Sequence, residues 1–202
     1  DMNRPPTLPD PNTTRLAAVD LGCQVDERWS ELDELRRLPD DLFATLRRTG
    51  LLRTLVPAQL GGVGTAPVEW MRLGVELARH DPSLGWVATQ GAAELGWIAA
   101  GGDPTWAADV LSDPDGASAS STAGVGRLVI DGRTAELSGR WSFNTGSTGA
   151  TWIGGLAMVE RQGVGPEGAE LRIAWVPVDR AEVADDWDPS GMRGTGSNST
   201  AI

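Results

Sequence analysis

The stretch Asp113-Pro114-Asp115-Gly116 decides the fold, because the periodicity of the sequence changes across it. Before this stretch, apolar residues recur at the spacing that places side chains on one face of a helix. After it, apolar and polar residues alternate, as in strands with one buried face. The layout is therefore α+β, with an all-helical domain followed by antiparallel strands. It lacks the strand–helix alternation of a dinucleotide-binding fold.

Capping and breaking residues set the limits of the helices in the first half. Thr14 is the expected cap of the first helix, and the imperfect apolar spacing around Gly22 permits a break there. Gly50 suits the position just after the second helix, and Asp103 suits the cap of the last. The expected helices are Arg15–Arg37, Pro39–Arg48, Ala66–His80, Pro82–Ala100 and Pro104–Ser112. A proline-rich flexible arm, residues 1–13, precedes the expected helical domain, residues 14–112.

The second half, residues 113–202, is expected to be a β-domain. Asp131-Gly132 is a two-residue turn signal, and it predicts a hairpin between the strands on either side. The expected strands are Arg127–Ile130, Ala135–Phe143, Thr151–Glu160, Glu170–Val176 and Glu182–Trp187. The last residues, Asn198–Ile202, resemble the start of a further strand. We therefore expect the domain to be truncated at its C-terminal end and the native chain to continue.

Charge and composition exclude several classes of function. The net charge is −11 and every basic residue is arginine, so nucleic-acid binding is not expected. Cys23 and His80 are the only residues of their types, which excludes an intramolecular disulfide and a zinc site of His and Cys, and no metal is expected. No secretory signal or membrane-spanning apolar run is visible. A cytoplasmic protein without membrane contact is expected.

Four segments resemble, in the same order, the signatures of the acyl-CoA dehydrogenase superfamily. In the first, a helix ends on Gly50 and leads to Pro57 and the pair Gly61-Gly62. The third contains Gly139-Arg140-Trp141-Ser142-Phe143-Asn144-Thr145-Gly146. The four segments are Leu38–Gly62, Ala78–Val87, Gly139–Trp152 and Trp187–Ser197. The Trp-x-Phe-x-[Ser/Thr]-Gly form of the third segment is closer to the two-component flavin-dependent monooxygenase branch.

The resemblance implies a flavin-dependent oxidoreductase of dehydrogenase or monooxygenase type. Its helical domain would be followed by an antiparallel β-barrel-like domain, and the family's C-terminal four-helix bundle would be absent from this N-terminal fragment. The cofactor would be FAD or FMN, and the substrate an acyl-CoA or a small aromatic or polyketide-like molecule. A flavin reductase or electron-transfer protein would be the partner, and a homo-oligomer is expected.

The resemblance also indicates which residues contact the flavin. A flavin ring is flat with a polar edge, so an indole can stack on it while hydroxyl and amide groups bond its carbonyls and nitrogens. The expected contacts are Trp141, Asn144 and Thr145, with Ser120, Ser121 and Thr122 from a serine-rich loop. Trp86 is expected in the substrate cavity. The structural alternatives are a core role for Trp141 and Trp86 and a solvated linker for the loop, and no catalytic residue is assigned.

A second hypothesis comes from a different class of protein. The chain would be a non-catalytic flavin- or ligand-binding module that pairs with a separate helical subunit. Mass spectrometry of the native protein distinguishes a naturally short chain from a cropped one.

The isolated 202-residue chain is predicted to be inactive. A flavin reaction requires the ring to be fixed against the substrate with water excluded, and by the resemblance the β-domain supplies only one wall of that cavity. Assays with acyl-CoA plus an electron acceptor, and with reduced flavin, oxygen and aromatic substrates, should show no turnover. Clear turnover in either assay would contradict the interpretation of the chain as a fragment.

Overall fold

The computed structural model describes residues 11–132, 134–161 and 170–202. The helical unit comprises the residues up to Ala117 with Pro189–Thr195, and the sheet unit comprises Ser118–Asp188 with Gly196–Ile202. The change from helix to strand falls where the sequence predicts it, because the last helix ends at Leu111 and the first strand begins at Ser118. Within the described ranges, no helix combines the length and hydrophobicity that a membrane span requires.

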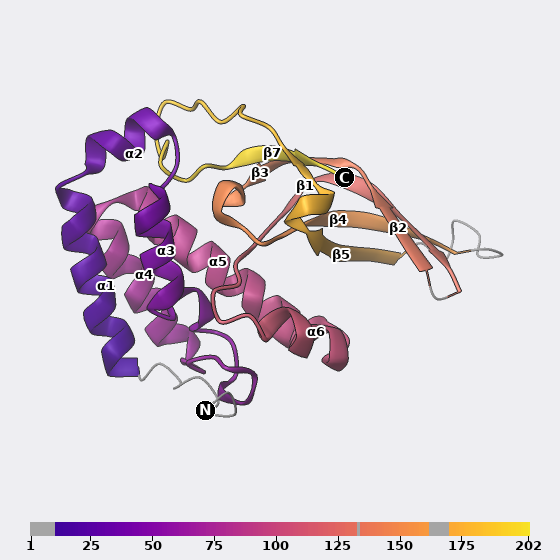
Figure 1. Cartoon of the computed structure of the whole chain (residues 1–202), viewed down its shortest axis with the longest axis horizontal. Helices are drawn as coiled ribbons and strands as arrows, with labels where there is room; N and C mark the ends of the chain where they lie inside the picture. The colour runs from indigo at the N-terminus through magenta and orange to yellow at the C-terminus, as the bar shows by residue number, and fades with distance from the viewer. Residues whose placement is uncertain (1–10, 133, 162–169) are drawn as a thin grey trace. The chain divides into compact units, whose positions relative to one another are not determined.

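The helical unit is built from the expected helices, with the first of them divided in two (Figure 1). They are α1 (Pro11–Asp26), α2 (Trp29–Leu35), α3 (Asp40–Arg48), α4 (Pro67–His80), α5 (Pro82–Gly101) and α6 (Pro104–Leu111), with short 3₁₀ helices η1 (Leu51–Arg53) and η2 (Ala58–Leu60). Asp103 caps α6 as predicted, since its carboxylate accepts from the N–H groups of Thr105 and Trp106 at 3.0 and 3.2 Å. Gly50 takes the left-handed conformation, φ 75°, just after α3.

The first helix differs from the expectation in where it begins and where it breaks. It starts earlier, at Pro11, because a proline in the first turn gives up only an N–H that has no intrahelical partner. It runs through Gly22 unbroken, since the missing side chain makes room for the His80 ring at the end of α4. A Cβ at Gly22 would lie 2.2 Å from His80 Cδ2. The His80 Nδ1 lies 2.7 Å from the carboxylate of Asp26, and residues 1–10 of the expected arm are outside the described part.

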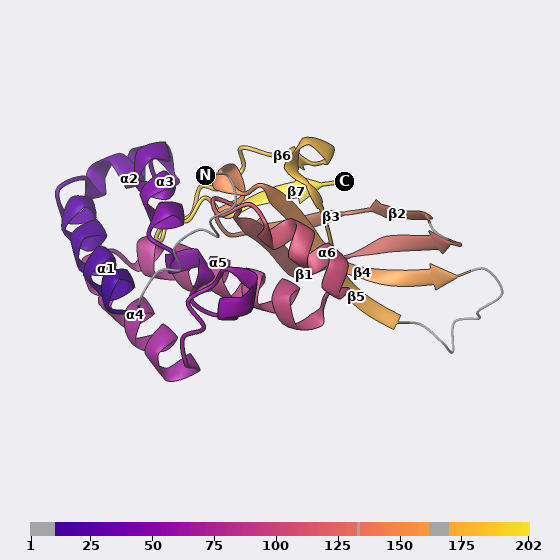
Figure 2. The same cartoon turned by 60° about the horizontal axis from the view of Figure 1, so that its bottom comes forward.

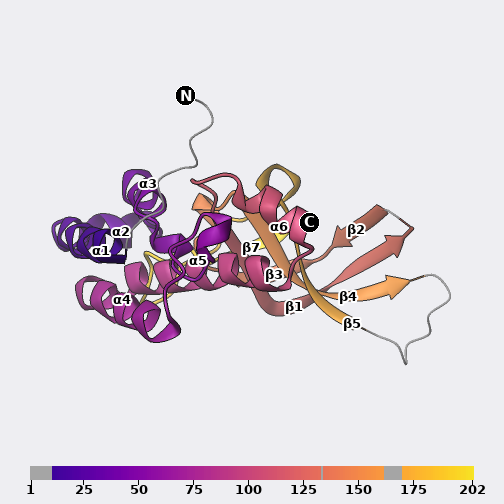
Figure 3. The same ribbon diagram turned by 90° about the horizontal axis from the view of Figure 1, so that it is seen from below.

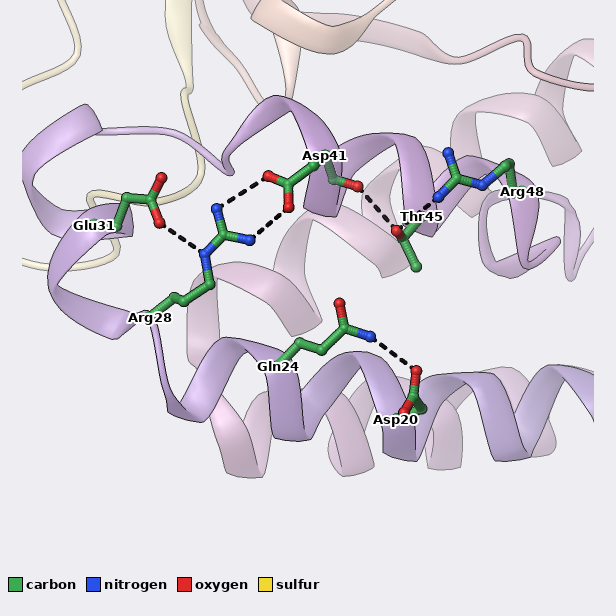
Figure 4. A network of polar contacts seen from close by, with 7 residues as sticks. All are labelled: Asp20, Gln24, Arg28, Glu31, Asp41, Thr45 and Arg48. Atoms are coloured by element: carbon green, nitrogen blue, oxygen red, sulfur yellow. Dashed lines mark hydrogen bonds and ion pairs between the residues drawn. The ribbon is translucent and has the colours of Figure 1, made fainter.

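The break occurs instead between α1 and α2, at Arg28 (Figure 4). The Arg28 guanidinium donates to both carboxylate oxygens of Asp41 in α3, at 2.6 and 3.0 Å, and its Nε donates to Glu31 in α2 at 2.7 Å. These donations lower the pKa of Asp41 and of Glu31. The pairs are exposed and contribute little stability. They connect the turn between α1 and α2 to residues of α2 and α3.

A buried arginine joins the glycine-rich loop to the end of α6. Arg53 is 5% exposed, and its guanidinium donates to the carbonyls of Leu60 and Gly61 at 3.1 and 2.9 Å. It also donates to the carbonyls of Leu111 and Asp113 at 2.7 and 2.8 Å. Burial lowers the pKa of Arg53, and the carbonyl dipoles at the C-terminal end of the helix offset part of the desolvation cost.

The late segment Pro189–Thr195 belongs to the helical unit because of Arg193. Its Nε lies 3.2 Å from the carboxylate of Asp33 and donates to that residue's carbonyl at 3.0 Å. An antiparallel bridge between Arg37 and Thr195 adds a second attachment.

The sheet unit is one curved sheet with the strand order β5-β4-β1-β3-β7-β6, and β2 pairs with β1 (Figure 2). The strands are β1 (Ser118–Asp131), β2 (Thr134–Ser138), β3 (Arg140–Asn144), β4 (Trp152–Arg161), β5 (Glu170–Pro177), β6 (Glu182–Val183) and β7 (Asn198–Ala201). The hairpin is confirmed, but Asp131 is the last residue of β1 and pairs with Thr134, so the turn begins one residue later than predicted, at Gly132. The expected antiparallel pairings hold except between β1 and β4, which run parallel.

The largest buried side chain of the sheet unit is a tryptophan in a slot made by glycines. Trp141 on β3 is 0% exposed, and its Nε1–H donates to the carbonyl of Leu156 on β4 at 2.8 Å. A Cβ at Gly126 would lie 2.3 Å from the indole, at Gly139 2.8 Å, and at Gly155 2.2 Å. Glycine at these positions is therefore required by the volume of the ring rather than by a turn.

Gly155→Ala is predicted to destabilise the sheet unit. The added methyl must displace the indole or bend β4, at a cost of about 1–3 kcal/mol. Gly101→Ala is the matched control, because a Cβ there meets no atom within 4 Å. Urea unfolding of both variants checks this, and an unfolding free energy for Gly155→Ala equal to that of the control would contradict the packing described.

Candidate functional site

The end of β3 presents an exposed aromatic side chain on a strained backbone. Phe143 is 61% exposed and has a φ of 64°, a left-handed conformation that bulky residues rarely adopt. Such conformations persist only where the surroundings impose them, and they gather at functional sites. The strain turns the Phe143 ring out of the sheet, while its neighbours Trp141 and Asn144 are buried. Sequence patterns gave no indication of this, because they predict an ordinary strand backbone for phenylalanine.

A second aromatic residue lies against Phe143. The rings of Phe143 and Trp187 are in edge-to-face contact, with centroids 6.0 Å apart and an interplanar angle of 85°. Asn198 of β7 holds Trp187 in place, since its side-chain oxygen accepts from the backbone N–H groups of Asp186 and Trp187 at 3.1 and 3.0 Å. The aromatic pair is thus fixed by β3 on one side and by β7 on the other.

The carboxylate of Asp186 completes this support. The backbone N–H of Ser199 donates to its Oδ1 at 2.7 Å, and this donation lowers the pKa of Asp186. Arg140 lies 3.6 Å from its other oxygen and acts in the same direction. Asp186 is therefore an ionised structural acceptor.

Two of the predicted cofactor residues lie beside the aromatic pair. Asn144 is fully buried, and its Nδ2 donates to the hydroxyl of Thr200 at 2.7 Å and to the carbonyl of Trp141 at 3.3 Å. The contact with a backbone carbonyl fixes the amide orientation, and the buried Oδ1 then has no donor. Thr145 is half-buried, and its hydroxyl lies 3.0 Å from the hydroxyl of Ser197.

The predicted serine-rich loop is part of strand β1, and its residues differ in burial and in hydrogen bonding. Ser121 uses its hydroxyl internally, since it donates to the carbonyl of Ser142 at 2.6 Å and accepts from the N–H of Ala123 at 2.9 Å. Ser120 is half-buried and Thr122 is exposed. The pairing of β1 with β4 shifts register between Ser121 and Gly126, so the segment from Thr122 onward forms an exposed bulge.

The two predicted tryptophans occupy different environments. Trp141 has no exposed surface, so a flavin ring could stack on it only if the sheet opened. Trp86 lies near the start of α5 in the helical unit and is 45% exposed.

The groups around Phe143 match the chemistry of a flavin ring. Phe143 and Trp187 offer exposed or half-buried aromatic surface to a flat ring. The hydroxyl of half-buried Thr145 can bond its carbonyls, whereas the Oδ1 of Asn144, which has no donor, is fully buried and could accept a ring N–H only if the sheet opened. Since these side chains are neutral, the arrangement suits recognition of a ring rather than proton transfer.

Comparison with known proteins gives consistent results. Residues 22–113 match the family described as acyl-CoA dehydrogenase, N-terminal domain. The chain is 30% identical over 192 residues to the flavin-dependent monooxygenase oxygenase subunit HsaA of Mycobacterium tuberculosis, covering 93% of this chain and 47% of that protein. It is 28% identical over 182 residues to an indole-3-acetate monooxygenase of Pseudomonas putida, covering 90% and 46%.

The fold is similar to that of a solved relative. The crystal structure of the HsaA monooxygenase from M. tuberculosis superposes with a TM-score of 0.86 at 27% identity, over 96% of this chain and 50% of that one. The chain thus spans about half the length of the relatives it matches.

Asp186→Asn is expected to destabilise the sheet unit at neutral pH but not in acid. Because the folded-state pKa is lowered, the carboxylate stabilises the fold above the unfolded-state value of about 3.9. That contribution is lost as the pH falls through the folded-state value. The difference in melting temperature from the wild type should be largest near neutral pH and shrink below about pH 4. The exposed carboxylate variant Asp179→Asn is the control, and a pH-independent difference for Asp186→Asn would contradict the assignment.

Proposed function

Because the chain belongs to the acyl-CoA dehydrogenase superfamily, we propose that it is the helical and β portion of a flavin-dependent monooxygenase. The protein would be the oxygenase component of a two-component system and would oxidise a small aromatic substrate. The observation that carries this proposal is the surface around Phe143, where a turned-out aromatic side chain lies beside neutral hydrogen-bonding groups. The similar proteins named above, which are monooxygenases, support the same branch.

The residues of this chain would bind and orient the flavin. Phe143 would stack on one face of the ring, with Trp187 beside it at 85° to the Phe143 ring, and Thr145, which lies 3.0 Å from the hydroxyl of Ser197, would bond its polar edge. Asn144 would accept from a ring N–H through its Oδ1, which has no donor, only if the sheet opened to expose this buried side chain. The exposed bulge from Thr122 would offer backbone N–H groups to the remaining polar atoms. When bound, the reduced flavin would supply the electrons that activate oxygen.

Trp141 would act indirectly. Its buried indole fixes β3 against β1 and β4, so it sets the position of the backbone from which Phe143 projects. Ser121 would contribute in the same way by bonding the carbonyl of Ser142. Trp86 would line the substrate cavity from the helical unit through its exposed surface, which is 45% of the residue.

The proposal also includes the partner protein and the residue ranges of the two domains. A separate flavin reductase would deliver reduced FAD or FMN, since one similar protein is named an oxygenase subunit. The helical domain would cover residues 14–112 and the β-domain residues 113–202, in a cytoplasmic homo-oligomer. Further chain would be needed to complete the cavity, because the relatives are about twice as long.

Anaerobic titration of the 202-residue chain with reduced and oxidised flavin tests the proposal. Reduced flavin should bind more tightly, and acyl-CoA should not bind. Phe143→Ala should weaken flavin binding by about 2- to 10-fold, the equivalent of about 0.5–1.5 kcal/mol for a lost aromatic contact. Leu171→Ala is the matched control, because Leu171 is an exposed apolar residue on β5, at the far edge of the same sheet.

The opposite outcomes are equally informative. Acyl-CoA affinity with a preference for oxidised flavin would assign the chain to the dehydrogenase branch. Flavin binding that Phe143→Ala leaves unchanged, with the fold intact by circular dichroism, would overturn the site.

A further inference from the structure

We propose that residues 142–145, at the end of β3, form a two-state gate that is closed in the described conformation and is opened by flavin. The inference rests on the proposed function, because flavin is the ligand that selects the open state. Strands β3 and β7 lie side by side (Figure 3), and Trp141 lies opposite Thr200. Asn144 lies opposite Asn198, so β3 carries one extra residue between the two pairs. This extra residue makes a β-bulge.

Two unfavourable features meet in the bulge. Phe143 has a φ of 64°, which is costly for a bulky residue. The buried Oδ1 of Asn144 has no donor among the described residues, so its lost hydration is not compensated. Both costs belong to the closed state. When the backbone of Phe143 relaxes to an extended conformation, the side chain of Asn144 turns outward and both costs are removed. The free-energy gap between the two states is therefore reduced, as a gate requires.

A buried hydrogen bond holds the gate closed. The Nδ2 of Asn144 donates to the hydroxyl of Thr200 at 2.7 Å, and neither residue is more than 1% exposed. The second contact of the same Nδ2, with the carbonyl of Trp141, is longer at 3.3 Å. The bond to Thr200 ties β3 to β7 across the bulge, and it has to break for Asn144 to turn outward.

Two anchors limit the movement to this short segment. On one side, the Trp141 indole fills its glycine slot and donates to a carbonyl of β4, so β3 stays in place there. On the other side, the hydroxyl of Ser147 donates to a backbone carbonyl just before β7 at 3.1 Å. Gly146, with a φ of 72°, supplies the hinge beside it. Opening thus turns the amide of Asn144 and the hydroxyl of Thr145 toward the polar edge of a flavin without unfolding the sheet.

Thr200→Val tests the gate by removing the acceptor of the buried hydrogen bond. The closed state is weakened, so the apparent affinity of the 202-residue chain for reduced flavin should rise by about 3- to 10-fold. A substitution that only damaged the site would weaken binding instead. Thr134→Val is the matched control and should leave the affinity unchanged. The hydroxyl of Thr134 donates to a backbone carbonyl in the β1–β2 hairpin, away from the bulge.

Phe143→Gly shifts the gate in the opposite direction. Glycine adopts a φ of 64° without strain, so this substitution stabilises the closed state. Phe143→Ala is the comparison, because it lacks the same ring but keeps the strain. Phe143→Gly should therefore melt at a higher temperature than Phe143→Ala and should bind reduced flavin more weakly.

Hydrogen–deuterium exchange without flavin follows the gate directly. The amides of residues 142–145 should exchange faster in Thr200→Val than in the wild type, while those of β4 keep their wild-type rates. Unchanged exchange in this segment, or flavin binding that Thr200→Val leaves unchanged or weakens, would overturn the gate. Faster exchange at the bulge in a chain that binds no flavin in any variant would support the two states of the bulge and overturn the proposed function alone.

Discussion

The sheet unit depends on one packing constraint, the fit of the Trp141 indole between strands that carry glycine at the points of contact. Gly126, Gly139 and Gly155 leave a slot that only a ring fills, and the single indole N–H is satisfied by the Leu156 carbonyl. A large side chain buried without strain stabilises a small sheet strongly, because it removes more apolar surface from water than any other residue can. The slot also fixes the lateral position of β3 between β1 and β7.

The candidate site follows from this fixed position. With Trp141 and Asn144 both buried, the residue between Ser142 and Asn144 must bridge two inward anchors, and the backbone at Phe143 takes a left-handed conformation to do so. The Phe143 ring is turned outward as a result and meets Trp187. The backbone strain at Phe143 therefore results from the buried positions of Trp141 and Asn144, which together fix the conformation of the residue between them. An aromatic surface arises at the strand end without any flexible loop.

In the helical unit, a buried arginine rather than a buried aromatic ring holds separate segments together. The guanidinium of Arg53 donates hydrogen bonds to four carbonyls and so joins η1, the glycine-rich loop and the end of α6. The inner faces of α4 and α5 pack closely, since a Cβ at Gly74 would lie 2.3 Å from Thr89. On the opposite side of α4, the apolar residues Val68, Met71 and Val75 are each more than half exposed.

The sequence by itself determined the division into helices and strands, the Asp103 cap, the turn after Gly50 and the hairpin at Asp131-Gly132. These features depend on neighbours in the chain, so local pattern is sufficient to predict them. It also indicated the family through ordered motifs. Only the tertiary structure decided that β4 runs parallel to β1, that α1 passes unbroken through Gly22 beneath His80, and that Trp141 is buried while Phe143 is turned out. Each of these results from contacts between residues far apart in sequence, and the local sequence pattern does not specify the volume that a distant side chain requires.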